Sequence, residues 1–278
     1  MTATRDPLEI RAEVRRAVAS LGEPTTSLSS TTSDLSIDEE FNLHAIGWEP
    51  VELVSGVSLF SVAQGYWNWG QGEIAAASFA HASAFRRAID RIHAEAVTAG
   101  AHGVVGVHVE RSVFPSHVEV SLLGTAVRPA GAPSRSPTEV FVSDLSARDF
   151  TMLMVAGWHP LGLATGASFV FAPRRSVSTV LQQQTQNVEL TNFTEAMYSA
   201  RETAMQRMQE SALALGGTGV VDVTVTEGPL PFASHAVGFA SWGTVVRLTG
   251  DAHRFVHPTT VVSLDDPVVV FDARTLAK

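Results

Sequence analysis

Residues 33–36 read Ser-Asp-Leu-Ser, and residues 143–146, which lie 110 positions later, read the same. Further identical residues follow both segments in one order, at offsets that grow from 110 to 116 and then to 119. They are Gly47-Trp48 with Gly157-Trp158, Gly103-Val104-Val105 with Gly219-Val220-Val221, and Gly124-Thr125 with Gly243-Thr244. Matches that keep their order in this way indicate an internal duplication, with short insertions in the second copy.

The first copy begins with signals for a short helix and a strand. Ser36 and Glu39 have the spacing of a capping box, which closes the first turn of a helix. Gly47 suits the left-handed position that ends a helix. Apolar residues then alternate with other residues over 50–57, which is typical of a strand with one buried face.

The rest of each copy predicts a long helix followed by a β-hairpin. Apolar residues recur at spacings of three and four over residues 74–99, as they do on the buried face of a helix. Valines then alternate with polar residues on both sides of a loop within residues 105–122, which predicts two paired strands. Because the second copy repeats this order, the expected fold class is α+β. It consists of two homologous two-layer units, each a long helix packed on a small antiparallel sheet.

These patterns divide the chain into five segments. The expected order is a flexible N-terminal segment (1–30), the first repeat (31–128), a linker (129–137), the second repeat (138–250) and a C-terminal extension (251–278). Short valine runs in the extension predict either an added terminal strand or a contact with a neighbouring subunit.

Composition and charge exclude several classes of protein. Nineteen Lys and Arg residues against 28 Asp and Glu give a net charge of -9, so the positive field that attracts nucleic acid or anionic lipid is missing. The absence of cysteine excludes disulfides, thiolate nucleophiles and Cys-ligated zinc. The apolar runs are too short for a membrane span, and the N-terminal residues do not resemble a secretory signal. We therefore expect a cytoplasmic protein that binds neither nucleic acid nor membrane.

The sequence also lacks the familiar catalytic motifs. It contains no G-x-S-x-G elbow, P-loop, G-x-G-x-x-G or H-E-x-x-H motif. The glycine-rich stretch 216–219 follows a helix and precedes a strand, which is the wrong end of a helix for anion binding. No spacing singles out a serine nucleophile with its base. We expect a protein that is not an enzyme and that carries no certain cofactor.

The first hairpin contains a candidate metal site. If the valine faces pair in register, His108 lies opposite Glu119, and Glu110 lies opposite His117. Two imidazoles and two carboxylates suit zinc or another borderline divalent ion. The alternative is cross-strand charge pairing on a solvated face. We favour the alternative, because the second copy has threonine at the positions that match His108 and Glu110.

An aromatic segment precedes the long helix of the first copy. Tyr66, Trp67 and Trp69 lie close together in an expected loop. They suit either a stacking platform for a flat ligand or a contact between subunits, where aromatic residues are enriched. We favour the subunit contact. The second copy has a glutamine-rich tract nearby, so the two loops face different surroundings.

The ordered motifs resemble those of the YbjQ family of small bacterial proteins, whose members carry a heavy-metal-binding name. The resemblance covers about residues 33–128 and, more loosely, 143–247. Its main features are Gly47-Trp48-Glu49-Pro50, Ala99-Gly100-Ala101, Gly103-Val104-Val105-Gly106-Val107 and Gly124-Thr125-Ala126-Val127. The resemblance implies a helix-on-sheet unit similar to dodecin subunits that assembles into closed rings, commonly of five. The lack of cysteine weakens a role in binding soft metals.

Together these observations predict a non-enzymatic, homo-oligomeric cytoplasmic protein that forms a ring or shell from two YbjQ-like domains per chain. The alternative function is binding of a zinc-like divalent ion by the four hairpin residues.

Overall fold

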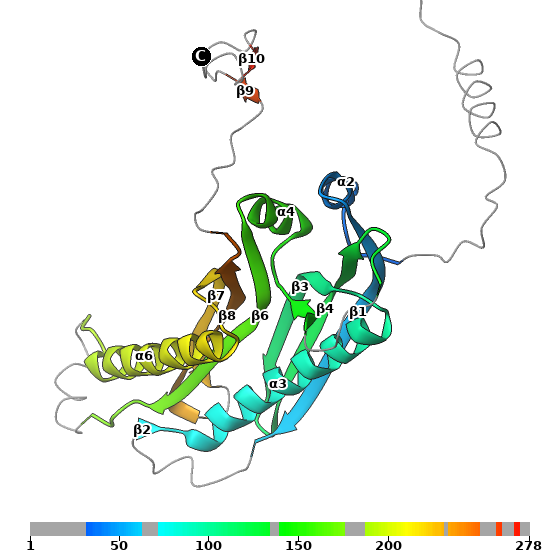
Figure 1. Cartoon of the computed structure of the whole chain (residues 1–278). Coiled ribbons are helices and arrows are strands. Elements are labelled where there is room, and N and C mark those ends of the chain that lie inside the picture. Colours follow the sequence, from blue (N-terminus) through cyan, green and yellow to red (C-terminus); the bar gives the residue numbers. More distant parts are fainter. Residues whose placement is uncertain are drawn as a thin grey trace, which may run out of the picture. The chain divides into compact units, whose positions relative to one another are not determined.

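The chain twice forms the series short helix, long strand, long helix and two paired strands, with one short edge strand added in each half (Figure 1). The computed structural model describes residues 32–62, 72–133, 139–175, 187–230, 233–250, 260–262 and 270–272. The first series is α2 (Ile37–Ala45), β1 (Trp48–Ser61), β2 (Gly72–Glu73), α3 (Ala75–Thr98), β3 (Gly103–Val113) and β4 (His117–Pro129). The second is β5 (Phe141–Val142), α4 (Ala147–Val155), β6 (Trp158–Phe171), α6 (Thr191–Ala214), β7 (Gly219–Leu230) and β8 (Ala233–Leu248). The expected α+β class with two repeated units is confirmed.

The short helices begin at the expected caps. In α2 the hydroxyl of Ser36 accepts a hydrogen bond from the backbone N of Glu39, and the Glu39 carboxylate accepts one from the backbone N of Ser36. In α4 the hydroxyl of Ser146 accepts from the backbone N of Asp149. Gly47 then takes φ +75°, which is the left-handed position that ends α2.

Each sheet combines strands from both repeats. The strand order of the first sheet is β1-β4-β3-β5, and that of the second is β2-β6-β8-β7. Strand β2 belongs to the first repeat but pairs with β6, whereas β5 belongs to the second repeat and pairs in parallel with β3. The two repeats are therefore interleaved at their sheet edges.

The long helix of each repeat crosses the first strand of its own sheet at a glycine. A Cβ on Gly56 would lie 2.1 Å from the carbonyl O of Ala88, and one on Gly166 would lie 2.0 Å from that of Ala204. The two glycines are 110 residues apart and the two alanines 116 residues apart, as the sequence offsets predict. We call two residues equivalent when these offsets relate them.

Helix α3 packs on both sheets, whereas α6 packs on the second sheet alone among the described elements (Figure 1). The face of α3 turned away from its own sheet places Ala77, with the preceding Ile74, against Phe169 of β6. The ring of Phe85 also lies 5.6 Å from that of Trp242 in β8. The buried residues of α6 form a single stripe toward β6 and β8, namely Ala196, Ala200, Ala204, Met208 and Ala212.

Residues Thr32–Lys278 form one compact unit. In the C-terminal extension β9 (Thr260–Val262) pairs with β10 (Val270–Asp272) in an antiparallel ladder. These residues thus form a two-stranded ladder, where the sequence predicted an added terminal strand, and the alternative contact with a neighbouring subunit stays a prediction. None of the described helices is long and apolar enough to cross a membrane.

Candidate functional site

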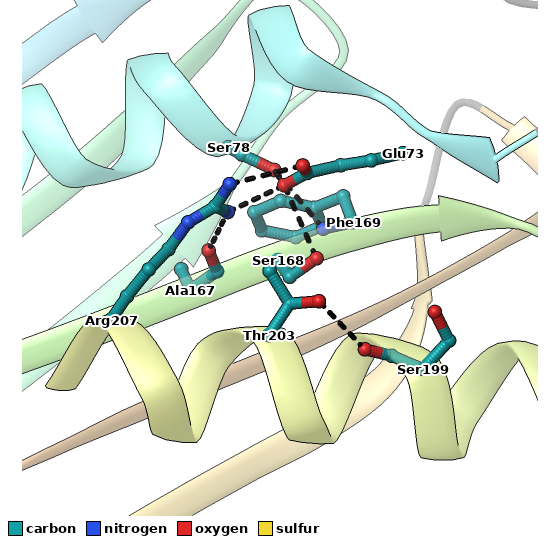
Figure 2. A network of polar contacts seen from close by, with 8 residues as sticks. All are labelled: Glu73, Ser78, Ala167, Ser168, Phe169, Ser199, Thr203 and Arg207. Atoms are coloured by element: carbon teal, nitrogen blue, oxygen red, sulfur yellow. Dashed lines mark hydrogen bonds and ion pairs between the residues drawn. The ribbon is translucent and has the colours of Figure 1, made fainter. Parts of the chain in front are cut away.

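The most elaborate polar cluster lies where the first repeat meets the second. It consists of Glu73 of β2, Ser78 of α3, Ser168 of β6 and Arg207 of α6, which we call the junction clamp (Figure 2). The Glu73 carboxylate accepts two bonds from Arg207, at 2.5 Å for Nη1 to Oε1 and 3.0 Å for Nη2 to Oε2. The hydroxyls of Ser78 and Ser168 donate to the same carboxylate over 2.7 and 3.2 Å. Four elements from two repeats are thereby joined at one carboxylate.

The clamp is also tied to the backbone of β6. Arg207 Nη1 donates to the carbonyl O of Ala167 over 2.7 Å, and the backbone N of Phe169 donates to the Ser78 hydroxyl over 3.2 Å (Figure 2). Bidentate pairing of a guanidinium with a carboxylate fixes direction as well as distance. The strand register of β2 on β6 is therefore held by side chains in addition to its ladder.

Electrostatics keep this carboxylate ionised. Burial acts to raise the pKa of Glu73, but the hydrogen bonds from Arg207 and Ser78, together with the charge of Arg207, bring the pKa below its usual value. The ionised clamp stabilises the fold above the ordinary pKa of a glutamate, and this stabilisation is lost as the pH falls through the lowered pKa.

Apolar side chains pack beside the clamp, whose Glu73–Arg207 pair itself stays partly exposed to solvent. Ile74 and Phe169 are buried together with alanines from both repeats. His81 of α3 is fully buried between the rings of Phe85 and Phe169, with centroids 5.1 and 5.5 Å away, and neither ring nitrogen has a partner among the described residues. Burial, and then the positive charge of Arg111, lower the pKa of His81 to about 3, so this histidine is neutral at pH 7.

A second contact joins the repeats at the β5 edge of the first sheet. The parallel bridge between β3 and β5 places Phe141 beside Trp48, and Phe150 of α4 lies with its ring centroid 5.1 Å from that of Trp48. These rings share a core with Leu43 of α2. The second repeat thus covers the end of the first repeat that carries its short helix.

The polar groups of the junction clamp bond mainly to one another and to the strand backbone. Its carboxylate already accepts bonds at both oxygens, and its guanidinium is occupied by a carboxylate and a carbonyl. The chemistry that this arrangement supports is the docking of one repeat on the next.

The predicted register of the first hairpin is wrong. His108 lies opposite Leu123 and Glu119 lies opposite Ser112, because β3 and β4 continue to Val113 and His117 and leave only a tight turn between them. An extra residue in β3 at Gly106, whose φ is +65°, changes the register by one residue on the side of His108 away from the turn.

The four predicted metal ligands are consequently not brought together. Four residues of strand, or about 13 Å, separate His108 from the position opposite Glu119. Only His108 and Glu110 approach each other, at 3.7 Å, and both side chains are largely exposed. His117 instead contacts Ser116 and stacks on the ring of Phe114. In the part of the chain that the structure describes, no group of three or more His, Asp or Glu side chains could hold a metal ion.

The donor set therefore does not fit a resident heavy-metal ion, since cysteine is also absent. Divalent-ion binding by the hairpin stays a prediction that metal analysis can test. The aromatic candidates Tyr66, Trp67 and Trp69 lie outside the described residues, and their role in a ligand or subunit contact also stays a prediction.

Sequence reasoning missed the residues of the junction clamp. Glu73 and Arg207 are single charges 134 residues apart, and neither belongs to a known motif. The signal that could have found them is the repeat itself, because a glutamate and an arginine recur at the equivalent positions, Glu189 and Arg91.

Two α+β repeats that exchange edge strands and share an ion pair define a tandem-repeat protein whose halves dock on each other. The profile of the YbjQ family, described as "Putative heavy-metal-binding", matches the chain twice, over residues 56–130 and 175–249. The matched ranges cover more than half of the chain. The protein belongs to the YbjQ family as a tandem duplication, as the motifs predicted.

Two relatives extend this finding. The chain is 35% identical over 243 residues to the "Encapsulin nanocompartment protein Rv1762c" of Mycobacterium tuberculosis, which covers 85% of this chain and 92% of the relative. It is 36% identical over 91 residues to a "UPF0145 protein" of Halorubrum lacusprofundi, which covers 32% of this chain and 83% of that protein. No solved structure gives a significant match to the chain.

Proposed function

We propose that this protein is a non-enzymatic subunit of a homo-oligomeric ring or shell. The observation that carries the proposal is an asymmetry between the repeats. Large apolar side chains of the first repeat are exposed at positions where the second repeat buries its equivalents against the first. A second copy of the chain offers the same kind of repeat to cover them.

The asymmetry is largest at the short helices. Ile37 and Phe41 of α2 are 90% and 72% exposed, whereas the equivalent Ala147 and Thr151 of α4 are buried. Helix α4 is buried because it packs on the first repeat beside Trp48. Helix α2 leaves the equivalent positions exposed.

The same contrast holds on the first strands. Leu59 of β1 is 62% exposed, and its equivalent in β6, Phe169, is 2% exposed. Burial of apolar surface contributes about 25 cal/mol for each Å² removed from water. Large apolar side chains that are exposed where the equivalent positions are buried indicate a protein interaction surface.

The comparison with known proteins supports the same function. The relative from Mycobacterium tuberculosis, which matches most of this chain, is named as an encapsulin nanocompartment protein. A compartment wall needs subunits that associate through repeated contacts and requires no catalytic group in each subunit. The absence of a catalytic role and the cytoplasmic location expected from the sequence are part of this proposal.

Native mass spectrometry of the untagged full-length protein tests the proposal. We expect one discrete oligomer at micromolar concentration, and rings or closed shells in negative-stain electron micrographs of the same sample. A strictly monomeric protein would contradict the proposal. Turnover of a substrate by the isolated protein would contradict its non-enzymatic part.

The same spectra test the alternative that the sequence left open. Metal binding at the first hairpin would add one divalent ion per chain, and the substitution His108→Ala would remove that ion. Spectra of protein prepared without chelator that show no stoichiometric metal would exclude the alternative.

A further inference from the structure

The carboxylate half of the junction clamp occurs a second time in the chain. Glu189 is the equivalent of Glu73, and it precedes α6 as Glu73 precedes α3. Thr194 Oγ1 donates to Glu189 Oε1 over 2.8 Å, just as Ser78 Oγ donates to Glu73 Oε1 over 2.7 Å. Glu189 is exposed and preorganised by the same type of hydroxyl contact.

The guanidinium half also occurs a second time. Arg91 of α3 is the equivalent of Arg207 of α6. It donates from Nη1 to the carbonyl O of Val57, as Arg207 does to that of Ala167. Ser58, the equivalent of the clamp serine in β6, lies in the next position of β1. Arg91 is exposed, and within the described residues no ion pair or hydrogen bond joins it to Glu189.

The sheet edges match in the same way. The second sheet has β2 on the outer edge of β6, with Gly72 opposite Phe171 and Glu73 opposite Val170. The first sheet ends at β1, so among the described strands this edge has no neighbour. An unpaired edge is a template for an incoming strand. The equivalent register would place Val188 opposite Ser61 and Glu189 opposite Phe60.

The apolar residues on both sides of this register are exposed. In the chain the backbone N of Ile74 donates to the carbonyl O of Phe169, and both side chains are buried there. The equivalent residues, Leu190 and Leu59, are both exposed. The exposed side chains of Leu190 and Leu59 would bury each other if two chains docked as the two repeats do within one chain. The expected partner is therefore a second copy of the chain.

We infer that residues Val188–Leu190 of one copy add to the free edge of β1 in a second copy, with Glu189 pairing with Arg91 of that copy. This inference rests on the proposed oligomeric function and names the contact that builds the oligomer. It reproduces between chains the docking that joins the repeats within one chain. The exposed face of α2 lies in the same contact, since its equivalent α4 packs on the preceding repeat.

The direction of this contact determines the kind of assembly. The second repeat of one copy meets the first repeat of the next, so the two surfaces differ and the contact is heterologous. Heterologous contacts close into rings when the rotation per unit divides a full turn. First and second repeats then alternate around the ring.

Cysteine cross-linking tests the register. The natural chain has no cysteine, so the double variant Ser61→Cys/Val188→Cys carries one pair of thiols that face each other only across two copies. Directly opposed residues in an antiparallel pair have Cβ atoms about 5 Å apart, within reach of a disulfide. Mild oxidation should give a ladder of covalent oligomers that a reductant collapses. The matched control Glu52→Cys/Val188→Cys places one thiol far along β1 and should stay monomeric on the denaturing gel.

Charge reversal tests the ion pair. Arg91→Glu and Glu189→Arg each place like charges in the contact, and we expect each to raise the dissociation midpoint of the oligomer at least about tenfold. The double variant Arg91→Glu/Glu189→Arg restores opposite charges and should reassemble, which also shows that its subunits fold. Glu210→Arg is a suitable control. The equivalent residue, Ala94, stays exposed when the first repeat docks on the second, so Glu210 should lie outside the contact between chains.

The outcomes separate this inference from the proposed function. A monomeric wild type would overturn both. A wild-type oligomer that survives both charge reversals, or that gives no cross-link between positions 61 and 188, would overturn the inference and leave the oligomer standing. Failure of the double variant to reassemble while its circular dichroism is unchanged would overturn the ion pair.

Discussion

At the scale of single residues, Asp144 distinguishes the second repeat from the first. Thr244 Oγ1 donates to its carboxylate over 2.5 Å, and the equivalent Thr125 donates to Asp34 in the first repeat. Burial, with a further contribution from Asp222, raises the pKa of Asp144 to about 6, although the bond from Thr244 opposes the rise. The first repeat has Gly106 where the second has Asp222.

The raised pKa predicts a change of stability with pH. A carboxyl that binds its proton more tightly in the folded state adds stability as the pH falls from above 6 toward its unfolded value of 3.8. Asp144→Asn keeps an acceptor for Thr244 and removes the buried charge. We expect it to raise the free energy of unfolding at pH 8 by about 2 kcal/mol.

Urea unfolding at pH 5 and pH 8 measures this effect. The gain from Asp144→Asn should be smaller at pH 5, where the wild-type carboxyl is largely protonated in the fold. Glu202→Gln, at an exposed site on α6, is the control and should leave the pH profile unchanged. An Asp144→Asn variant that is equally destabilised at both pH values would show that the ionised carboxylate is the stabilising form.

At the scale of elements, the helix–strand crossings at Gly56 and Gly166 set how closely each layer packs. We expect Gly166→Ala to lower the free energy of unfolding by at least about 2 kcal/mol, because the new methyl meets the backbone of α6 and cannot be accommodated by a side-chain movement. Thermal unfolding followed by circular dichroism measures the loss.

Gly219→Ala provides the matched control for this crossing. Its new Cβ would lie 3.7 Å from the nearest side-chain atom, that of Val246, which is ordinary contact. We expect a change within about 0.5 kcal/mol. Equal losses of unfolding free energy in the two variants would show that the strands themselves require glycine. The close approach of α6 to Gly166 would then not be the cause of the loss.

The elements that sequence predicts well are those whose signals are local. The capping residues Ser36 and Glu39, the periodicity of α3 and the alternating valines each act within a few residues, and each element appears where it was expected. The edge strands β2 and β5 are only two residues long, and each pairs with the other repeat. Nothing in their own residues marks them as strands.

The misplaced metal site has a different cause, because the strands continue to Val113 and His117, closer to the turn than the alternating valines indicate. The bulge at Gly106 is held by contacts from the second repeat, since its backbone N donates to the carbonyl O of Leu145 and that of Val107 donates to the carbonyl O of Ser143. These partners belong to the other repeat, so the residues of the hairpin alone give no sign of the bulge. The junction clamp could be predicted only by aligning the repeats and comparing charges at equivalent positions.

At the scale of the whole molecule, the interleaving of the repeats predicts how the chain unfolds. The first repeat buries Trp48 against Phe141 and Phe150 of the second, and the second repeat buries Phe169 against Ile74 of the first. Neither core is complete without the other. We therefore expect one cooperative transition for residues 32–250 in place of two separate domain transitions.

Differential scanning calorimetry of the Arg91→Glu variant separates this unfolding from dissociation of the oligomer, because that substitution is expected to weaken the contact between chains and leave the junction clamp within the chain intact. The calorimetric and van't Hoff enthalpies should agree. Two resolved transitions would contradict the expectation. A fragment that ends at residue 137 should not fold alone, since it lacks β5, α4 and the partner of Glu73. A cooperative melting transition of the fragment would show that the first repeat folds without the second. The contact between repeats would then contribute little to folding, and we would expect the equivalent contact between chains to be weak.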